Sequence, residues 1–305
     1  MNNWRTLPAI AAGSLLLLVT ACAQGADGTG AGAPGLPVAD AADPSGVVLR
    51  VEHTGGYVTP AILLGRLPMV TVYADGRVIT EGPQTLAFPG PALPNVQVQR
   101  IAGEDVDRLI ERARAAGVEA GTDLGRPSIT DVPSTRFTVR FATGTEVLEV
   151  YALDTGFQQP DGSAEGGAPS DGLTEAQRAG RAKLRELVAA LTDLAGTLGA
   201  DRVGPAEPYQ PSAVAALATA WPGDPEGLPA QPALAWPGPA LPGPSLGPGP
   251  DPGCVELRGA ALSELLTMAT KANAQTPWTS GDDRWTVALR PLLPDETECA
   301  DLATD

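Results

Sequence analysis

Histidine, aromatic residues and positive charge are scarce in this sequence. Its 305 residues contain one histidine, His53, and only 4% aromatic residues. A single histidine excludes a metal site built from several imidazoles, and no sequence motif points to a cofactor. Lys and Arg total 20 against 36 Asp and Glu, a formal net charge of −16. Because such a chain is repelled by phosphate groups, we expect no nucleic-acid partner.

Long uninterrupted helices and strands are also excluded. The chain contains 36 Gly and 31 Pro, and both residue types interrupt regular structure. No coiled coil, helical bundle or doubly wound sheet can therefore extend over its whole length. Apolar residues still make up 43% of the chain, which is enough for one or two modest hydrophobic cores.

The N-terminal residues have the pattern of a secretion signal. Residues 1–21 carry one basic residue and then an apolar stretch of about 13 residues, shorter than the roughly 20 that span a bilayer. The tetrapeptide VTAC at 19–22 resembles the lipobox of bacterial lipoproteins. That resemblance implies cleavage before Cys22 and attachment of a lipid to its thiol. The alternative is an ordinary cleaved signal followed by a chance cysteine.

A lipid on Cys22 predicts a mature chain held at the extracytoplasmic face of the cell membrane. Buried acyl chains contribute about 0.8 kcal/mol per CH₂, which fixes a soluble body at the bilayer surface. Residues 22–46 are rich in Gly, Ala, Pro and Asp, so we expect a disordered stalk there. Cleavage of residues 1–21 leaves 19 basic and 36 acidic residues, a net charge of −17. This charge suits a domain held away from anionic lipid.

Export also determines the expected state of the other two cysteines. Cys254 and Cys299 form an even pair in an oxidising compartment, so we predict a disulfide between them. The alternative is a pair of free redox-active thiols, but the sequence contains no C-x-x-C motif.

Residues 47–200 predict an α+β domain, an antiparallel sheet with helices packed on one face. Alternating apolar and polar residues indicate strands, and apolar residues at i, i+3, i+4 and i+7 indicate helices. The strands are expected at 47–53, 69–81 as a hairpin with an Asp75-Gly76 turn, 95–101, and 134–153 as a second hairpin; the helices are expected at 103–117 and 174–199.

A second, related α+β lobe is expected in the rest of the chain. Residues 201–221 would supply one strand, and 254–305 two strands and a helix. Between them, 222–253 holds 11 Pro and 7 Gly and predicts an irregular segment. The hexapeptide PGPALP occurs at 89–94 and again at 237–242, an offset of 148. The repeat indicates duplication of one unit, with coincidence in a Pro- and Gly-rich chain as the alternative.

No catalytic residue or metal site can be assigned from the sequence. His53 lies in phase with the apolar residues of its strand, which favours a structural imidazole over a catalytic one. The G-x-S-x-G pattern at 243–247 lies among prolines, not between a strand and a helix. Acidic pairs such as Asp282-Asp283 and Asp295-Glu296 have the oxygen ligands that Ca²⁺ prefers. Without a calcium-loop motif, we interpret them as solvated turns.

Tryptophan is unevenly distributed, since four of the five tryptophans follow residue 220. Trp221 and Trp236 each lie in an A-W-P-G tetrapeptide and are candidates for an exposed binding surface for peptides or glycans. The alternative is that the tryptophans fill the core of a small lobe.

Two stretches of the body, 55–82 and 284–296, resemble uncharacterised actinobacterial lipoproteins. The resemblance implies class and location, and the ratio of 18 Arg to 2 Lys is typical of high-GC bacteria. We expect a protein without catalytic activity that binds or scaffolds an envelope protein, peptide or glycan. One alternative is a secreted hydrolase, which requires carboxylates near each other or near His53. Another is an inhibitor or signalling partner of an exported protein, which requires an exposed apolar patch.

Overall fold

The computed structural model describes residues 46–154, 171–224, 230–247 and 252–303. These residues belong to one compact unit, 38–305. The predicted signal, Cys22 and the predicted stalk up to residue 45 lie outside the described residues. So do residues 155–170 and parts of the Pro- and Gly-rich segment.

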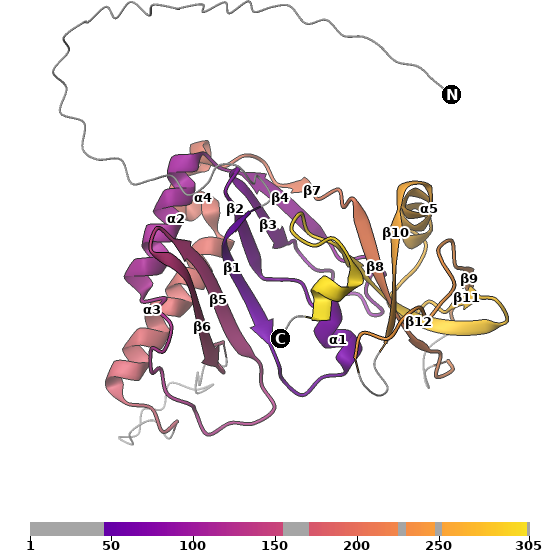
Figure 1. Cartoon of the computed structure of the whole chain (residues 1–305), viewed down its shortest axis with the longest axis horizontal. Helices are drawn as coiled ribbons and strands as arrows, with labels where there is room; N and C mark the ends of the chain where they lie inside the picture. The colour runs from indigo at the N-terminus through magenta and orange to yellow at the C-terminus, as the bar shows by residue number, and fades with distance from the viewer. Residues whose placement is uncertain (1–45, 155–170, 225–229, 248–251, 304–305) are drawn as a thin grey trace, which may run out of the picture. The chain divides into compact units, whose positions relative to one another are not determined.

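The first lobe is built on a seven-stranded sheet, as the α+β prediction requires. Its strands follow the order β6-β5-β1-β2-β3-β4-β7, and each neighbouring pair is antiparallel. Their bounds are β1 (Val47–Thr54), β2 (Val70–Tyr73), β3 (Arg77–Glu81), β4 (Val96–Arg100), β5 (Ser134–Phe141), β6 (Gly144–Tyr151) and β7 (Glu207–Pro208). The alternation at 47–53 and 134–153 thus predicted β1, β5 and β6, which lie side by side in Figure 1.

Helices α2 (Gly103–Ala116) and α3 (Glu175–Thr192) pack on one face of this sheet (Figure 1). A capping box begins α3, at the predicted helix start: the Thr174 hydroxyl accepts from the Gln177 backbone N–H, and the Gln177 side chain accepts from the Thr174 N–H. Reciprocal bonds of this kind satisfy two backbone donors at the helix start. The helix α4 (Leu194–Leu198) and a short 3₁₀ turn (Ala200–Arg202) follow.

The tight turn between β2 and β3 explains why glycine occupies position 76. Gly76 has φ +83°, and a Cβ there would lie 2.2 Å from the Ile101 carbonyl oxygen. The Asp75 carboxylate accepts from the Arg77 backbone N–H at 3.1 Å and closes the turn. Any L-residue with a side chain at 76 would therefore meet both backbone strain and a steric clash.

The second lobe contains a five-stranded sheet in the order β10-β8-β12-β11-β9. Its elements are β8 (Ala213–Ala220), β9 (Leu234–Ala235), β10 (Gly253–Arg258), α5 (Gly259–Ala269), β11 (Trp278–Ser280) and β12 (Asp283–Pro291). All described pairs are antiparallel except β9 with β11. The short strand β9 shows that 222–253, predicted to be irregular, also contributes to the sheet.

The strand orders of the two sheets do not show the proposed duplication. At the same offset of 148, RFTV at 136–139 in β5 corresponds to RWTV at 284–287 in β12, and β2 corresponds to β8 by its place before each PGPALP copy. The strands β8 and β12 are direct neighbours in the second sheet. Their counterparts in the first sheet, β2 and β5, are separated by β1. Moreover, Ala92 of the first PGPALP copy and Leu241 of the second lie in the same hydrophobic cluster. The two copies therefore do not occupy equivalent places in two lobes, and duplication stays a prediction.

The chain ends by returning to the first lobe. After β12, Leu293 packs with Tyr73, Ile79 and Val96 in a small apolar cluster against the first sheet. A 3₁₀ turn, η2 (Cys299–Ala303), follows. Its Cys299 forms the predicted disulfide with Cys254 of β10. Helix α1 (Pro60–Gly65), which the sequence analysis did not predict, contacts β8, β12 and η2.

Candidate ligand-binding pocket

The end of β1, helix α1 and the C-terminal segment 291–303 enclose a pocket of about 640 Å³. This volume lies within the roughly 300–1,000 Å³ typical of small-molecule sites. Its lining contains four arginines and four acidic residues. The charged lining residues are Arg50, Arg66, Arg136 and Arg290 against Glu52, Asp295, Glu296 and Asp301. In a chain with a net charge of −16, this pocket is locally balanced.

A first ion pair joins β1 to the C-terminal segment. The Arg50 guanidinium donates to both carboxylate oxygens of Asp295, at 3.0 and 2.8 Å, and its Nε donates to the Thr71 hydroxyl at 3.3 Å. The Tyr73 hydroxyl also donates to Asp295, at 2.7 Å. Burial and then the nearby Asp295 carboxylate raise the pKa of Tyr73 far above its usual value. Tyr73 therefore stays a neutral hydrogen-bond donor.

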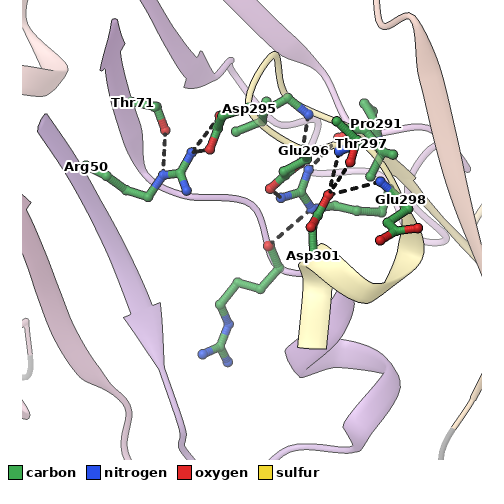
Figure 2. A network of polar contacts seen from close by, with 12 residues as sticks. Arg50, Thr71, Pro291, Asp295, Glu296, Thr297, Glu298 and Asp301 are labelled. Carbon is green, nitrogen blue, oxygen red and sulfur yellow. Dashed lines mark hydrogen bonds and ion pairs between the residues drawn. The ribbon is translucent and has the colours of Figure 1, made fainter. Parts of the chain in front are cut away.

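A second ion pair, Arg290 with Glu296, is almost fully buried. The two side chains lie 2.8 Å apart and are 3% and 9% exposed. Arg290 also donates to the backbone carbonyls of Arg66 and Pro291, and Glu296 accepts from the Leu293 N–H at 2.7 Å. Figure 2 shows this network beside Asp301, whose carboxylate accepts from Thr297 and Glu298 at the start of η2. The network fixes the C-terminal turn that forms one wall of the pocket.

Two charged lining residues, Arg66 and Glu52, take part in no ion pair among the described residues. Arg66 follows α1, and its Nη1 donates to the carbonyls of His53 and Gly55 at 3.3 and 3.1 Å. Glu52 lies in β1 opposite Arg136 of β5, and Arg136 is bonded instead to Glu149 at 3.3 Å. The other two arginines are paired as described above. Glu52 does interact electrostatically with the nearby Arg50, but its carboxylate accepts no hydrogen bond among the described residues. Arg66 and Glu52 are therefore a cation and an anion that a ligand can pair.

The remaining wall is apolar and comes mainly from the segment after β1. Helix α1 and the residues that follow it contribute Leu63, Leu64 and Leu67; Leu246 and Leu302 also line the pocket and pack with Leu64 against the same hydrophobic cluster. Helix α1 has no buried residue, and Ile62 and Leu63 are 53% and 38% exposed. The pocket thus combines charged residues from β1, from Arg66 after α1 and from the C-terminal segment with leucines that come mainly from α1 and the residues after it.

His53 forms a close pair with a carboxylate at the edge of this region. Its Nε2 lies 2.6 Å from an oxygen of Asp154, to which the Thr135 hydroxyl also donates at 3.2 Å. Asp154 is positioned from α3, because Arg181 donates to the carbonyls of Tyr151 and Ala152 just before it. The carboxylate contact that the hydrolase alternative requires is therefore present. The hydroxyl group next to this pair is that of Thr135, which lies opposite His53 in the neighbouring strand and donates to the same Asp154 oxygen rather than to the imidazole.

The His53 contact predicts a specific pH dependence of stability. The hydrogen bond from His53, with smaller effects from Thr135 and Arg185, lowers the pKa of Asp154. A carboxyl whose pKa is lower in the folded state stabilises the fold above its usual pKa and loses this contribution as pH falls through the lowered value. Asp154→Asn should therefore reduce stability at pH 7 and lose less stability than the wild type on acidification below about pH 5. Urea unfolding at several pH values measures this, with the exposed Asp107→Asn as the control; parallel curves for wild type and Asp154→Asn would contradict it.

Of the two acidic pairs that were expected to lie in solvated turns, only one does so. Asp282 and Asp283 are exposed, as expected. Asp295 and Glu296 are not, because each pairs with an arginine of the pocket. That interpretation was therefore wrong for the second pair. Its signal in the sequence, two acids after a Pro in a segment rich in leucine, is indistinguishable from a surface turn without the arginines contributed from β1 and β12.

The tryptophan candidates lie away from this pocket and are half-buried. Trp236 packs edge-on against Trp278 with ring centres 5.5 Å apart, and its indole N–H donates to the Pro239 carbonyl. A binding surface at Trp221 and Trp236 stays a prediction. The most exposed large apolar side chains among the described residues lie elsewhere, including Tyr57, Leu86 and Phe88. In the G-x-S-x-G segment, the Ser245 hydroxyl donates to the Gly247 carbonyl at 2.8 Å.

Within the described ranges, no three His, Cys, Asp or Glu side chains gather in a way that could hold a metal ion. In the same ranges, no helix combines the length and apolarity needed to cross a bilayer. Comparison with known proteins found no matching family model, curated protein or solved structure.

Proposed function

We propose that this chain is a lipid-anchored extracytoplasmic protein that binds a small molecule in the pocket between β1, α1 and segment 291–303. The observation that carries the binding role is the unpaired charge of the pocket. Arg50 and Arg290 are paired with acids, whereas Arg66 and Glu52 line the same pocket without an ion pair among the described residues. Leaving charged groups unpaired is costly where they are partly shielded from water, and a bound ligand offsets that cost.

The anchor is supported by the VTAC tetrapeptide and by the length of chain that follows it. Cys22 lies 24 residues before Gly46, the first described residue. A fully extended chain spans up to roughly 3.3–3.6 Å per residue, so these residues can separate the folded unit from a bilayer by tens of ångströms. The pocket would then face the extracytoplasmic space, where it can meet molecules of the envelope.

Replacing the anchoring cysteine gives a direct test of location. Cys22→Ser removes the thiol that would carry the lipid, so we expect the protein to move from the membrane fraction to the medium or to a soluble extracytoplasmic fraction. The disulfide cysteines lie in the folded body, and Ser45→Cys serves as a control that keeps Cys22. Cell fractionation and immunoblotting measure the distribution. Retention of the Cys22→Ser protein in the membrane fraction would rule out the anchor.

A hydrolase is the second candidate function, and the His53–Asp154 pair is the observation that favours it. A histidine oriented by a carboxylate can act as a general base toward water. The variant Asp154→Asn removes the orienting charge and keeps the shape of the side chain. If the wild type hydrolyses ester or amide substrates and Asp154→Asn lowers the rate by more than about tenfold, the catalytic role is supported. Equal rates for the two proteins would exclude it.

A further inference from the structure

We infer that the pocket binds a zwitterion with an apolar body, and specifically a short peptide with free ends and aliphatic side chains. This inference rests on the proposed binding role of the pocket and adds the chemical class of the ligand. It follows from three features described above: one unpaired cation, one unpaired anion and an apolar wall formed by leucines.

Arg66 is the partner for the carboxylate end of the ligand. Hydrogen bonds from Nη1 to two backbone carbonyls hold its guanidinium in place. No described residue accepts a hydrogen bond from its Nη2 or Nε. A guanidinium has five N–H donors in a planar fork, and carboxylates match that geometry. The contacts to His53 and Gly55 therefore orient Arg66 while leaving N–H groups for a ligand.

Glu52 is the partner for the ammonium end. An ionised carboxylate only accepts hydrogen bonds, and no described group donates one to Glu52. Arg50, the neighbouring cation, is already bonded to both oxygens of Asp295, and Arg136 is bonded to Glu149. Glu52 repels a ligand that carries only negative charge, and Arg66 repels one that carries only positive charge. A ligand with both charges pairs with both residues.

The apolar wall determines the body of the ligand. Leu63, Leu64 and Leu67 come from α1 and the residues after it, and Leu302 faces them from η2. Burial of aliphatic side chains against leucines is favourable by about 25 cal/mol per Å² of apolar surface. With a volume of about 640 Å³, the pocket has room for several residues of a peptide. A pocket that offers one cation, one anion and several leucines thus fits a short aliphatic peptide better than a sugar, which has no ionic ends.

Four forms of one peptide test this inference without changing the protein. Trileucine carries both charges; its N-acetyl form keeps only the carboxylate, its amide form only the ammonium, and the doubly blocked form neither. Calorimetry on the soluble Cys22→Ser protein measures affinity, and chemical shifts of the amides of Thr54, Gly55 and Leu64 locate binding. We expect trileucine to bind most tightly and each block to weaken binding by about tenfold, the loss expected for a hydrogen-bonded charge.

Two variants assign the ends of the peptide to the two residues. Glu52→Gln should abolish the preference for trileucine over its N-acetyl form and keep the preference over its amide. Arg66→Gln should do the reverse. The exposed residues Glu264 and Arg140 provide matched controls, and Glu264→Gln and Arg140→Gln should leave both preferences unchanged. Because Arg66 also donates to two backbone carbonyls, the thermal unfolding of Arg66→Gln is first compared with that of the wild type. If Arg66→Gln does not fold, the result for Glu52→Gln decides the test.

The possible results separate this inference from the proposed function. If all four peptides bind with equal affinity and shift the pocket amides, the pocket does not select a zwitterion. It would then be a pocket that binds apolar molecules. Tighter binding of the N-acetyl form would likewise overturn the role of Glu52. If none of the peptides shifts the pocket amides, the peptide inference is overturned. The binding role itself is overturned if a set of small fragments of differing charge also leaves those amides unchanged.

Discussion

Glu296→Ala should lower the free energy of unfolding by about 3–5 kcal/mol, the loss measured when one partner of a buried ion pair is removed. The variant leaves the Arg290 guanidinium, 3% exposed, without its counter-ion. It also removes the acceptor of the Leu293 backbone N–H. Urea unfolding at pH 7 measures the change. The effect is large because the arginine cannot move into water without disrupting the contacts of β12.

Glu298→Ala is the matched control for that prediction. Glu298 lies two residues away in the same segment, but its side chain is exposed. Surface substitutions of this kind change stability by less than about 0.5 kcal/mol. A loss for Glu296→Ala no larger than that of Glu298→Ala would show that the Arg290–Glu296 pair does not hold the C-terminal segment in place.

Removal of the Cys254–Cys299 disulfide should lower the free energy of unfolding by about 4 kcal/mol. The two cysteines are 45 residues apart in the sequence. The chain-entropy model gives about 4 kcal/mol for a loop of that length, because the cross-link restricts the unfolded chain. The double variant Cys254→Ser/Cys299→Ser in the Cys22→Ser background provides the comparison. Both cysteines are buried, at 3% and 7% exposure, so the serines also bring a small polar cost.

Treatment with reductant distinguishes the stability contributed by the disulfide from the cost of burying the two serine hydroxyls. In the Cys22→Ser background, Cys254 and Cys299 are the only remaining cysteines, and they form the disulfide. Adding reductant should destabilise this protein by nearly the same amount as the double substitution and should leave the double variant unchanged. An unfolding midpoint that does not respond to reductant in the disulfide-bonded protein would contradict a stabilising role for the cross-link.

Most of the regular structure could be predicted because its signals are local. The alternation in STRFTVRF gives β5, and the apolar residues at 106, 109, 110 and 113 give α2. The capping pair Thr174 and Gln177 gives the start of α3. In each case residues within a few positions of one another determine the backbone conformation. Helix α1 was not predicted, since six residues are too few for a periodic pattern.

The pocket could not be predicted, because its residues come from distant parts of the chain. Glu52 and Arg66 lie near the start of the folded body, whereas Arg290, Asp295 and Glu296 lie near its end. In the sequence, Asp295 and Glu296 have the features of a surface turn, and Arg50 has the features of an outward-facing strand residue. These residues meet only in the folded chain, where the C-terminal segment packs beside β1 and Arg50 pairs with Asp295. The partner of His53 has a similar origin, since Asp154 follows another hairpin.

Arg50 and Asp295 are separated by 245 positions in the sequence. The pocket is therefore completed only near the end of chain synthesis. A chain that stops before residue 291 contains every described strand except the last residue of β12, yet it lacks one wall of the pocket. A ligand that requires this wall binds only the completed fold. By mass action it then adds RT ln(1 + [L]/Kd) to the stability of the whole unit. Occupancy would thus protect the full-length protein, and not its truncated forms, from proteolysis.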